Sequence, residues 1–143
     1  MSLVGRLLED DVGHGIVHFE IPADDPEKLA DFYRGVFGWQ IDKMTMGDGM
    51  DYWSLQTVPT DDKGMPTEPG GINGGLMKRQ NPGQGAVNYI DVESVEEYVG
   101  KAKAAGATVL VDKMPVPGMG YFAQLVDPQG NPFGIWNTDP SAA

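Results

Sequence analysis

Residues 16–21 read Ile-Val-His-Phe-Glu-Ile, a short β-rich run that is followed at once by a helix signal. Asp25 is a candidate N-cap, and Pro26 stands at the first helical position, where its missing N–H costs nothing. Apolar residues then recur at helical spacing: Leu29, Phe32, Tyr33, Val36 and Phe37. Gly38 can supply a left-handed C-cap. This stretch therefore predicts a strand followed by one helix.

The same signals return later in the chain, which indicates an internal repeat. Four segments match in the same order, at offsets of 70, 70, 69 and 59 positions. The pairs are Val17-His18-Phe19 with Val87-Asn88-Tyr89, Asp42-Lys43-Met44 with Asp112-Lys113-Met114, Gly49–Trp53 with Gly118–Phe122, and Gly75-Leu76-Met77 with Gly134-Ile135-Trp136. Such ordered agreement is hard to obtain by chance, so we interpret the chain as a duplication.

Each copy reads as a strand, a helix and three further strands. In the second copy Val87–Val92 is the strand, Ser94 and Glu97 form a capping box, and Gly106 ends the helix. The later strand candidates are 39–45, 52–58 and 72–78, then 108–114, 121–126 and 132–137. The predicted class is α+β, with two tandem βαβββ modules. We expect their curved mixed sheet to form a cup, with the helices on its outer face.

The length of 143 residues and an apolar share of 41% suit one domain with one real core. We place this domain at 12–138, with module one at 13–80, a connector at 80–85 and module two at 86–138. Residues 1–11 and 139–143 are then tails. The Pro-, Gly- and acid-rich segment 59–71 is predicted to be either a functional flap or disordered.

Composition excludes several classes of function. A net charge of −11 repels phosphate backbones, so nucleic-acid binding is not expected. No apolar run is long enough for a membrane helix. The absence of cysteine excludes disulfides, thiolate metal sites and cysteine nucleophiles. These features predict a soluble, cytoplasmic protein.

Strand alternation separates two faces of the first strand. Val17, Phe19 and Ile21 are apolar and should face the helix, which leaves His18 and Glu20 on the opposite face. In the second copy this pattern places Val87 and Tyr89 on the helix side, and Asn88 at the position of His18. A carboxylate is costly to bury unpaired, so the polar face favours a cleft. The alternative is a solvated sheet face, on which His18 and Glu20 pair with each other or with a cation.

The paired modules resemble the vicinal oxygen chelate superfamily, which includes glyoxalase I, bleomycin-resistance proteins and extradiol dioxygenases. The resemblance rests on residues 16–21, on Phe32-Tyr33 and Gly38-Trp39, and on the closing hairpin from Asp127 to Trp136. It covers the chain from about Gly13 to Trp136. The resemblance is specific for the fold, but it says much less about the reaction, because the superfamily includes several unrelated reactions on one fold.

Glyoxalase-like members bind a divalent metal through one residue of each first strand and one of each last strand. In this chain, the resemblance places these positions at His18, Asn88, Gly75 and Gly134; a register shifted by one residue would replace Asn88 with Val87. Only His18 is a good ligand, so it is a weak metal candidate on its own. A divalent metal cofactor is therefore possible but disfavoured.

Three functional hypotheses follow from this pattern. The first is an enzyme related to lactoylglutathione lyase that moves a proton with His18 and Glu20 as catalytic groups. The second is a non-catalytic binder of a drug or metabolite, with a cup lined by aromatic and polar groups. The candidate lining residues are Asn88, Trp53, Tyr121, Phe122 and Trp136. The third is a structural domain with a filled cup. The resemblance also implies a homodimer.

Overall fold

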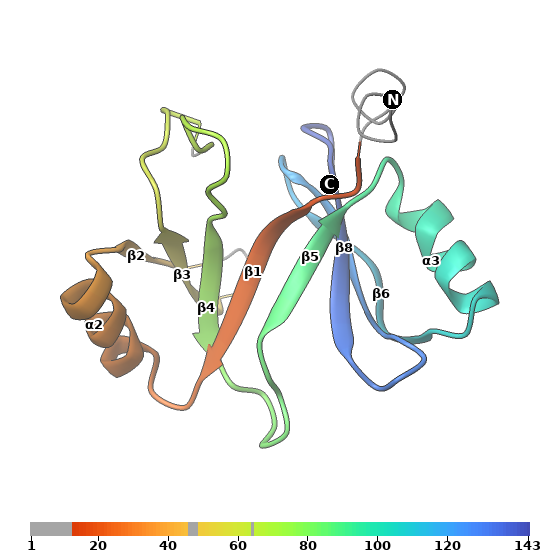
Figure 1. Cartoon of the computed structure of the whole chain (residues 1–143), viewed down its shortest axis with the longest axis horizontal. Coiled ribbons are helices and arrows are strands. Elements are labelled where there is room, and N and C mark those ends of the chain that lie inside the picture. Colours follow the sequence, from red (N-terminus) through yellow and green to blue (C-terminus); the bar gives the residue numbers. More distant parts are fainter. Residues whose placement is uncertain (1–12, 46–48, 64) are drawn as a thin grey trace, which may run out of the picture. The chain divides into compact units, whose positions relative to one another are not determined.

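The computed structural model describes residues 13–45, 49–63 and 65–143, which form two compact units (Figure 1). The first unit comprises residues 17–88, and the second comprises residues 13–16 and 89–143. Residue 16 and residues 87–88 are described below with the strands to which they belong. The predicted tail 1–11 lies outside the described residues.

The first unit has the element order strand, helix and three strands. Its elements are β1 (Ile16–Ala23), α2 (Pro26–Phe37), β2 (Gln40–Thr45), β3 (Asp51–Gln56) and β4 (Gly74–Lys78). The strands lie in the order β2-β3-β4-β1. β1 pairs with β4 in parallel, while β2, β3 and β4 pair antiparallel.

The second unit repeats this arrangement. Its elements are β5 (Val87–Asp91), α3 (Val95–Ala104), β6 (Thr108–Val116), β7 (Gly120–Val126) and β8 (Pro132–Thr138). The strands lie in the order β5-β8-β7-β6, and β5 pairs with β8 in parallel. The predicted α+β class, with two βαβββ modules and mixed strand pairing, is therefore confirmed.

Both helices begin at the predicted capping residues. The Asp25 carboxylate accepts the N–H of Lys28 at 3.2 Å, and Gly38 closes α2 with a φ of 72°. Ser94 Oγ accepts the N–H of Glu97 at 3.2 Å at the start of α3. The Glu97 carboxylate pairs with Lys101 at 3.0 Å, one helical turn further on.

In the first unit, one face of the sheet packs on α2. The buried residues of this core are Ala23, Ala30, Ile41, Trp53, Leu55 and Leu76. Phe19 and Ile21 pack against it from β1, as strand alternation predicts, whereas Val17 at the start of the strand is 45% exposed. Residues of opposite parity, His18 and Glu20 among them, therefore lie on the helix-free face.

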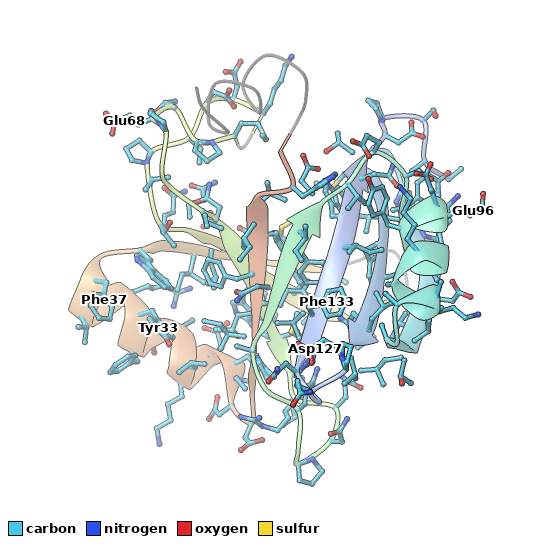
Figure 2. The ribbon with its side chains drawn as sticks, turned by 45° about the vertical axis from the view of Figure 1, so that its right-hand side comes forward. Tyr33, Phe37, Glu68, Glu96, Asp127 and Phe133 are labelled. Atoms are coloured by element: carbon cyan, nitrogen blue, oxygen red, sulfur yellow. The ribbon has the colours of Figure 1, made fainter. Side chains whose placement is uncertain are left out.

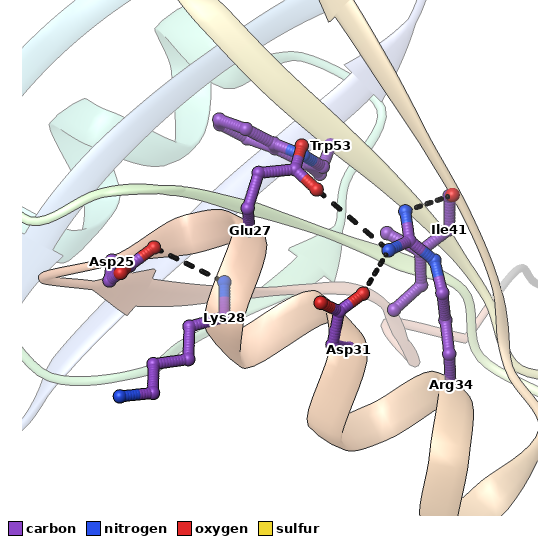
Figure 3. A network of polar contacts seen from close by, with 7 residues as sticks. All are labelled: Asp25, Glu27, Lys28, Asp31, Arg34, Ile41 and Trp53. Atoms are coloured by element: carbon purple, nitrogen blue, oxygen red, sulfur yellow. Dashed lines mark hydrogen bonds and ion pairs between the residues drawn. The ribbon is translucent and has the colours of Figure 1, made fainter.

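Polar contacts tie α2 to this core (Figure 3). The indole N–H of Trp53 donates to Glu27 at 2.7 Å. Arg34 donates to Asp31 at 2.9 Å and to the carbonyl oxygen of Ile41 at 2.8 Å. The bonds to Trp53 and Ile41 run between the helix and the strands β3 and β2, so they hold α2 in register over the sheet.

The apolar spacing of α2 does not bury all of its members. Leu29 and Tyr33 pack on the core, and the Tyr33 ring stacks on Trp39 with centroids 4.7 Å apart. Phe32, Val36 and Phe37 are each more than half exposed. Figure 2 shows Tyr33 and Phe37 on this helix. Ala30 is fully buried instead, which shows that the buried stripe is rotated from the one the spacing suggests.

The second unit has its own core beneath α3. Val92, Val95, Val99, Ala123, Leu125 and Ile135 are its buried members. Ile90 and Val92 face this core, so Tyr89 lies on the opposite, helix-free face. The prediction that Val87 and Tyr89 face the helix is therefore wrong.

The strand pairing explains this correction. Glu20 lies opposite Gly75 in the β1–β4 pair, and Tyr89 lies opposite Gly134 in the β5–β8 pair. The two first strands are thus related by an offset of 69 positions, as are the helix caps Asp25 and Ser94. The mate of His18 is therefore Val87, as the shifted register allowed, and not Asn88.

The turn between β7 and β8 is held by Asp127 (Figure 2). Its carboxylate accepts the backbone N–H groups of Gln129 and Asn131 at 2.8 and 3.0 Å. Hydrogen bonds from Asn131 are the main cause that lowers the pKa of Asp127 below its ordinary value of 3.8.

This lowered pKa predicts a pH-dependent contribution to stability. The ionised carboxylate stabilises the folded state above the unfolded pKa, and this stabilisation is lost as the pH falls through the folded pKa. We therefore expect Asp127→Ala to lower the melting temperature at pH 7, with a difference that shrinks below about pH 4. Thermal melts of wild type and the variant at pH 7 and below about pH 4 measure this effect. A difference in melting temperature that is the same at both pH values would contradict it.

The segment 59–71 is described apart from residue 64. An isolated bridge joins Thr60 to Pro66, and the Asp61 carboxylate accepts the N–H groups of Lys63 and Met65 at 2.8 and 3.0 Å. The described part of this loop is therefore a hydrogen-bonded turn. Among the described residues, no helix is long and apolar enough to cross a membrane.

Candidate functional site

Three polar side chains meet on the helix-free face of the first unit. His18 and Glu20 come from β1, and Tyr52 comes from β3. The Tyr52 hydroxyl lies 3.1 Å from Nε2 of His18 and 3.2 Å from Oε2 of Glu20. His18 Nε2 and Glu20 Oε2 are 3.6 Å apart, which is too long for a direct hydrogen bond. Tyr52 is therefore the link between the two residues.

The direction of these hydrogen bonds follows from their chemistry. An ionised carboxylate only accepts, so the hydroxyl of Tyr52 donates its proton to Glu20. The Tyr52 oxygen then accepts from His18, which requires the proton of the neutral imidazole to be on Nε2. This assignment orders the three groups into one chain, from His18 through Tyr52 to Glu20.

Gly75 on β4 makes room for the Tyr52 hydroxyl. A Cβ atom at position 75 would lie 1.6 Å from the Tyr52 hydroxyl oxygen and 2.0 Å from Cζ. The phenol thus occupies the space that any side chain at position 75 would need. This is one of the four positions at which the resemblance places a metal ligand, so a hydroxyl from the neighbouring strand fills the place of the missing ligand.

The three groups remain accessible to a ligand. The His18 side chain is 35% exposed and that of Glu20 is 19% exposed. Tyr52 is likewise partly buried. A small molecule that contacts this face can therefore reach His18 directly, while the carboxylate of Glu20 is more sheltered.

The matching positions of the second unit have a different chemistry. Val87, Tyr89 and Phe122 are the mates of His18, Glu20 and Tyr52. The Tyr89 and Phe122 rings meet edge to face with centroids 6.4 Å apart, and Tyr89 also fills the space beside Gly134. The Tyr89 hydroxyl accepts a hydrogen bond from Gln124 at 2.6 Å. This face is therefore aromatic, whereas its counterpart is polar.

The remaining predicted site residues do not share one face. Trp53 is 5% exposed in the core beneath α2, and Tyr121 packs on the core beneath α3. Trp136 pairs across the strands with Phe122 and lies on the helix-free face of its unit, with its indole N–H bonded to Thr138 at 3.0 Å. Asn88 is an exposed residue of β5. We therefore leave Trp53 and Tyr121 out of the site.

Sequence reasoning missed Tyr52. A partial signal was present, because Trp53 and Leu55 are apolar members of β3 and strand alternation places Tyr52 on the opposite face from them. The glycine at position 75 of the neighbouring strand was the second signal.

The residues of this face do not fit the family's metal site. Catalytic zinc sites use three protein ligands. His18 and Glu20 are the metal-ligating types here, and the described residues contain no group of three or more His, Cys, Asp or Glu side chains that could hold an ion. Val87 and the two glycines contribute no side-chain ligand at the matching positions. We therefore derive no chemical step that passes through a metal.

A separate shallow hollow of about 230 Å³ lies in the second unit. It is lined by His14, Asp91, Glu93 and Asn137, among others. His14 Nδ1 lies 2.9 Å from the Asp91 carbonyl oxygen, and burial raises the pKa of the Asp91 carboxyl above 3.8. None of the predicted site residues lines this hollow.

Comparison with known proteins gives a consistent family assignment. The family model described as "Glyoxalase-like domain" matches residues 17–136. "Putative glyoxylase CFP32" of Mycobacterium tuberculosis is 28% identical over 141 residues, which are 96% of this chain and 49% of that protein. A "Glyoxylase-like domain-containing protein" of Didymella fabae is 30% identical over 128 residues, with 85% of this chain and 93% of that protein covered. This chain thus spans about half the length of the mycobacterial relative.

Solved structures show the same fold. The methylmalonyl-CoA epimerase of Streptomyces coelicolor, in complex with 2-nitronate-propionyl-CoA, superposes with a TM-score of 0.64 at 17% identity, covering 92% of this chain and 99% of the epimerase. A hypothetical protein of Bacillus halodurans, BH1468, gives a TM-score of 0.63 at 20% identity, covering 91% and 98%. At this identity the likeness concerns the fold alone. Because the family model matches residues 17–136, which are most of this chain, the chain belongs to the glyoxalase-like domain family.

Proposed function

We propose that this chain is an enzyme that binds a small carbonyl compound on the helix-free face of the first unit and moves a proton of that compound. The hydrogen-bonded group of His18, Tyr52 and Glu20 is the observation that carries the proposal. His18 acts as the base and Glu20, once protonated, as the acid, which is the usual work of imidazole and carboxyl groups near neutral pH. The glyoxylase names of the relatives support an enzyme, and the reaction would be of the lactoylglutathione lyase type.

The charges of the first unit point to a substrate that is not anionic. Three of its cations are held in ion pairs, two of which are Lys43 with Asp51 at 3.6 Å and Arg79 with Asp24 at 2.9 Å. Arg34 pairs with Asp31 on α2. Together with a net charge of −11, this disfavours phosphate-bearing ligands such as coenzyme A esters. We therefore expect a neutral or cationic substrate.

A paired assay tests the proposed function. The hemithioacetals of methylglyoxal with 2-mercaptoethanol and with glutathione present the same reacting carbon on a neutral and an anionic carrier. We expect turnover of the neutral probe, weaker turnover of the glutathione probe, and a loss of about 10²-fold or more in His18→Ala and Glu20→Gln. Equal turnover by wild type and both variants would contradict the proposal.

A second candidate function is non-catalytic binding. The aromatic face of Tyr89, Phe122 and Trp136 favours it, because aromatic rings are common anchors for small organic ligands. A neutral aromatic probe that binds to wild type and Glu20→Gln equally, without any turnover of the hemithioacetals, would support this alternative. The homodimer, the cytoplasmic location and the ligand role of Asn88 stay predictions.

A further inference from the structure

We propose that Tyr52 is a third catalytic group, which relays a proton between His18 and Glu20. This inference rests on the proposed function and deepens it. The relay is needed because His18 Nε2 and Glu20 Oε2 are 3.6 Å apart, whereas the Tyr52 hydroxyl lies 3.1 and 3.2 Å from these two atoms. The phenol has one proton to give to Glu20 and lone pairs with which to accept one from His18.

The position of Tyr52 is built into two neighbouring strands. Ser54, two residues further along β3, lies opposite Gly75 in the β3–β4 pair, and Glu20 lies opposite the same glycine in the β1–β4 pair. The Tyr52 ring therefore reaches from β3 across the bare backbone of β4 to the side chains of β1. A side chain at position 75 would block this path, since its Cβ would overlap the hydroxyl oxygen.

The balanced reaction can be written for a hemithioacetal. The C–H bond next to the carbonyl breaks, its proton passes to His18, and its electron pair forms the double bond of an enediolate as the carbonyl π pair moves to oxygen. The imidazolium passes its Nε2 proton to the Tyr52 oxygen, while Tyr52 passes its hydroxyl proton to Glu20 Oε2. Glu20 then protonates the neighbouring carbon, and the proton of the first hydroxyl moves to the second oxygen. The product is the isomeric thioester, with no atom gained or lost. Because Nε2 of the resting imidazole holds a proton, the substrate proton arrives on Nδ1; loss of that proton to water and uptake of another on Nε2 return His18 to its starting state.

The relay separates two measurable steps. In Tyr52→Phe the ring stays over Gly75 and His18 still removes the proton, but the path to Glu20 is cut. We therefore expect the substrate's C–H to exchange with deuterium from heavy water within a few-fold of the wild-type rate. Formation of the thioester is expected to fall about 10²-fold, in the range of general acid–base effects. A merely structural role would lower both rates together.

The experiment uses the hemithioacetal of methylglyoxal with 2-mercaptoethanol as its probe. NMR follows deuterium exchange in the remaining substrate and product formation in wild type, Tyr52→Phe, His18→Ala and the control Tyr121→Phe. Tyr121 packs on the other core, so its variant should match wild type. Thermal melts check that each variant is folded.

The outcomes distinguish the relay from the proposed function. A selective loss of product formation in Tyr52→Phe supports the relay. Unchanged rates, or equal losses of both rates, overturn the relay while a loss of exchange in His18→Ala still upholds the proposed function. Wild-type exchange that persists unchanged in His18→Ala contradicts the proposed function, and with it the relay.

Discussion

Replacing Trp53 with alanine is expected to destabilise the chain by about 3–5 kcal/mol, the usual cost of removing a large aromatic side chain from a core. Trp53 is 5% exposed, and its indole N–H donates to Glu27 at 2.7 Å. The variant would leave a cavity beneath α2 and a carboxylate without this donor. Urea unfolding followed by circular dichroism measures the loss.

Trp136→Ala is the matched control for this prediction. Trp136 is only partly buried, and its indole N–H donates to Thr138 of its own strand. We expect a clearly smaller loss of stability than for Trp53→Ala. If Trp53→Ala were as stable as wild type and lost only ligand binding, Trp53 would be a pocket residue and its assignment to the core would be wrong.

Replacing Gly75 with alanine is expected to cost about 2 kcal/mol and to disrupt the site. The new Cβ would overlap the Tyr52 ring, and an over-packed position of this kind costs roughly 1–3 kcal/mol. Because the ring has to move, the Tyr52 hydroxyl would leave its place between His18 and Glu20. We expect a fall of roughly 5–10 °C in the melting temperature, together with loss of hemithioacetal turnover.

Two further variants show whether the cause is this overlap. Gly35→Ala lies on α2 with nothing within 4 Å of the added Cβ, so it should not lower the melting temperature. In a Tyr52→Ala background, Gly75→Ala should cost little, because the overlapping ring is gone. Equal losses with and without the Tyr52 ring would contradict the close approach of these two residues.

Much of the fold could be predicted because its signals are local. Asp25, Pro26 and Gly38 mark the ends of α2, and Ser94 marks the start of α3, each through a bond within a few residues. Strand alternation correctly separated Phe19 from His18. The exposure of Phe32, Val36 and Phe37 was harder to predict, because the spacing of apolar residues does not determine which part of a broad apolar stripe faces the core.

The predicted register of the repeat was wrong by one position. This error assigned the side chains of β5 to the wrong faces. Val87-Asn88-Tyr89 resembles Val17-His18-Phe19 in hydropathy, but a shift of one residue moves every side chain to the other face. The cap residues Asp25 and Ser94 are 69 positions apart, and this offset is the correct register of the two first strands. Cap positions are fixed by backbone hydrogen bonds, whereas apolar matches tolerate a slip.

Only part of the candidate site could be predicted from the sequence. His18 and Glu20 share a face by alternation alone, but their link to Tyr52 spans 34 and 32 residues of sequence. Such a contact depends on the order β3-β4-β1 and on the bare backbone at Gly75, neither of which is a local property. For the same reason, Trp53 could not be assigned to the core before the faces of β3 were known.

The protonation state of His18 is the most direct test of this account, because the hydrogen-bonded order from His18 through Tyr52 to Glu20 requires it. The chain contains only two histidines, so ¹⁵N-labelled histidine gives two sets of imidazole signals, and His14→Gln assigns them. At a pH where His18 is neutral, we predict that its proton is on Nε2 in wild type and that Tyr52→Phe weakens this preference. A neutral His18 with its proton on Nδ1, unchanged by Tyr52→Phe, would contradict the account.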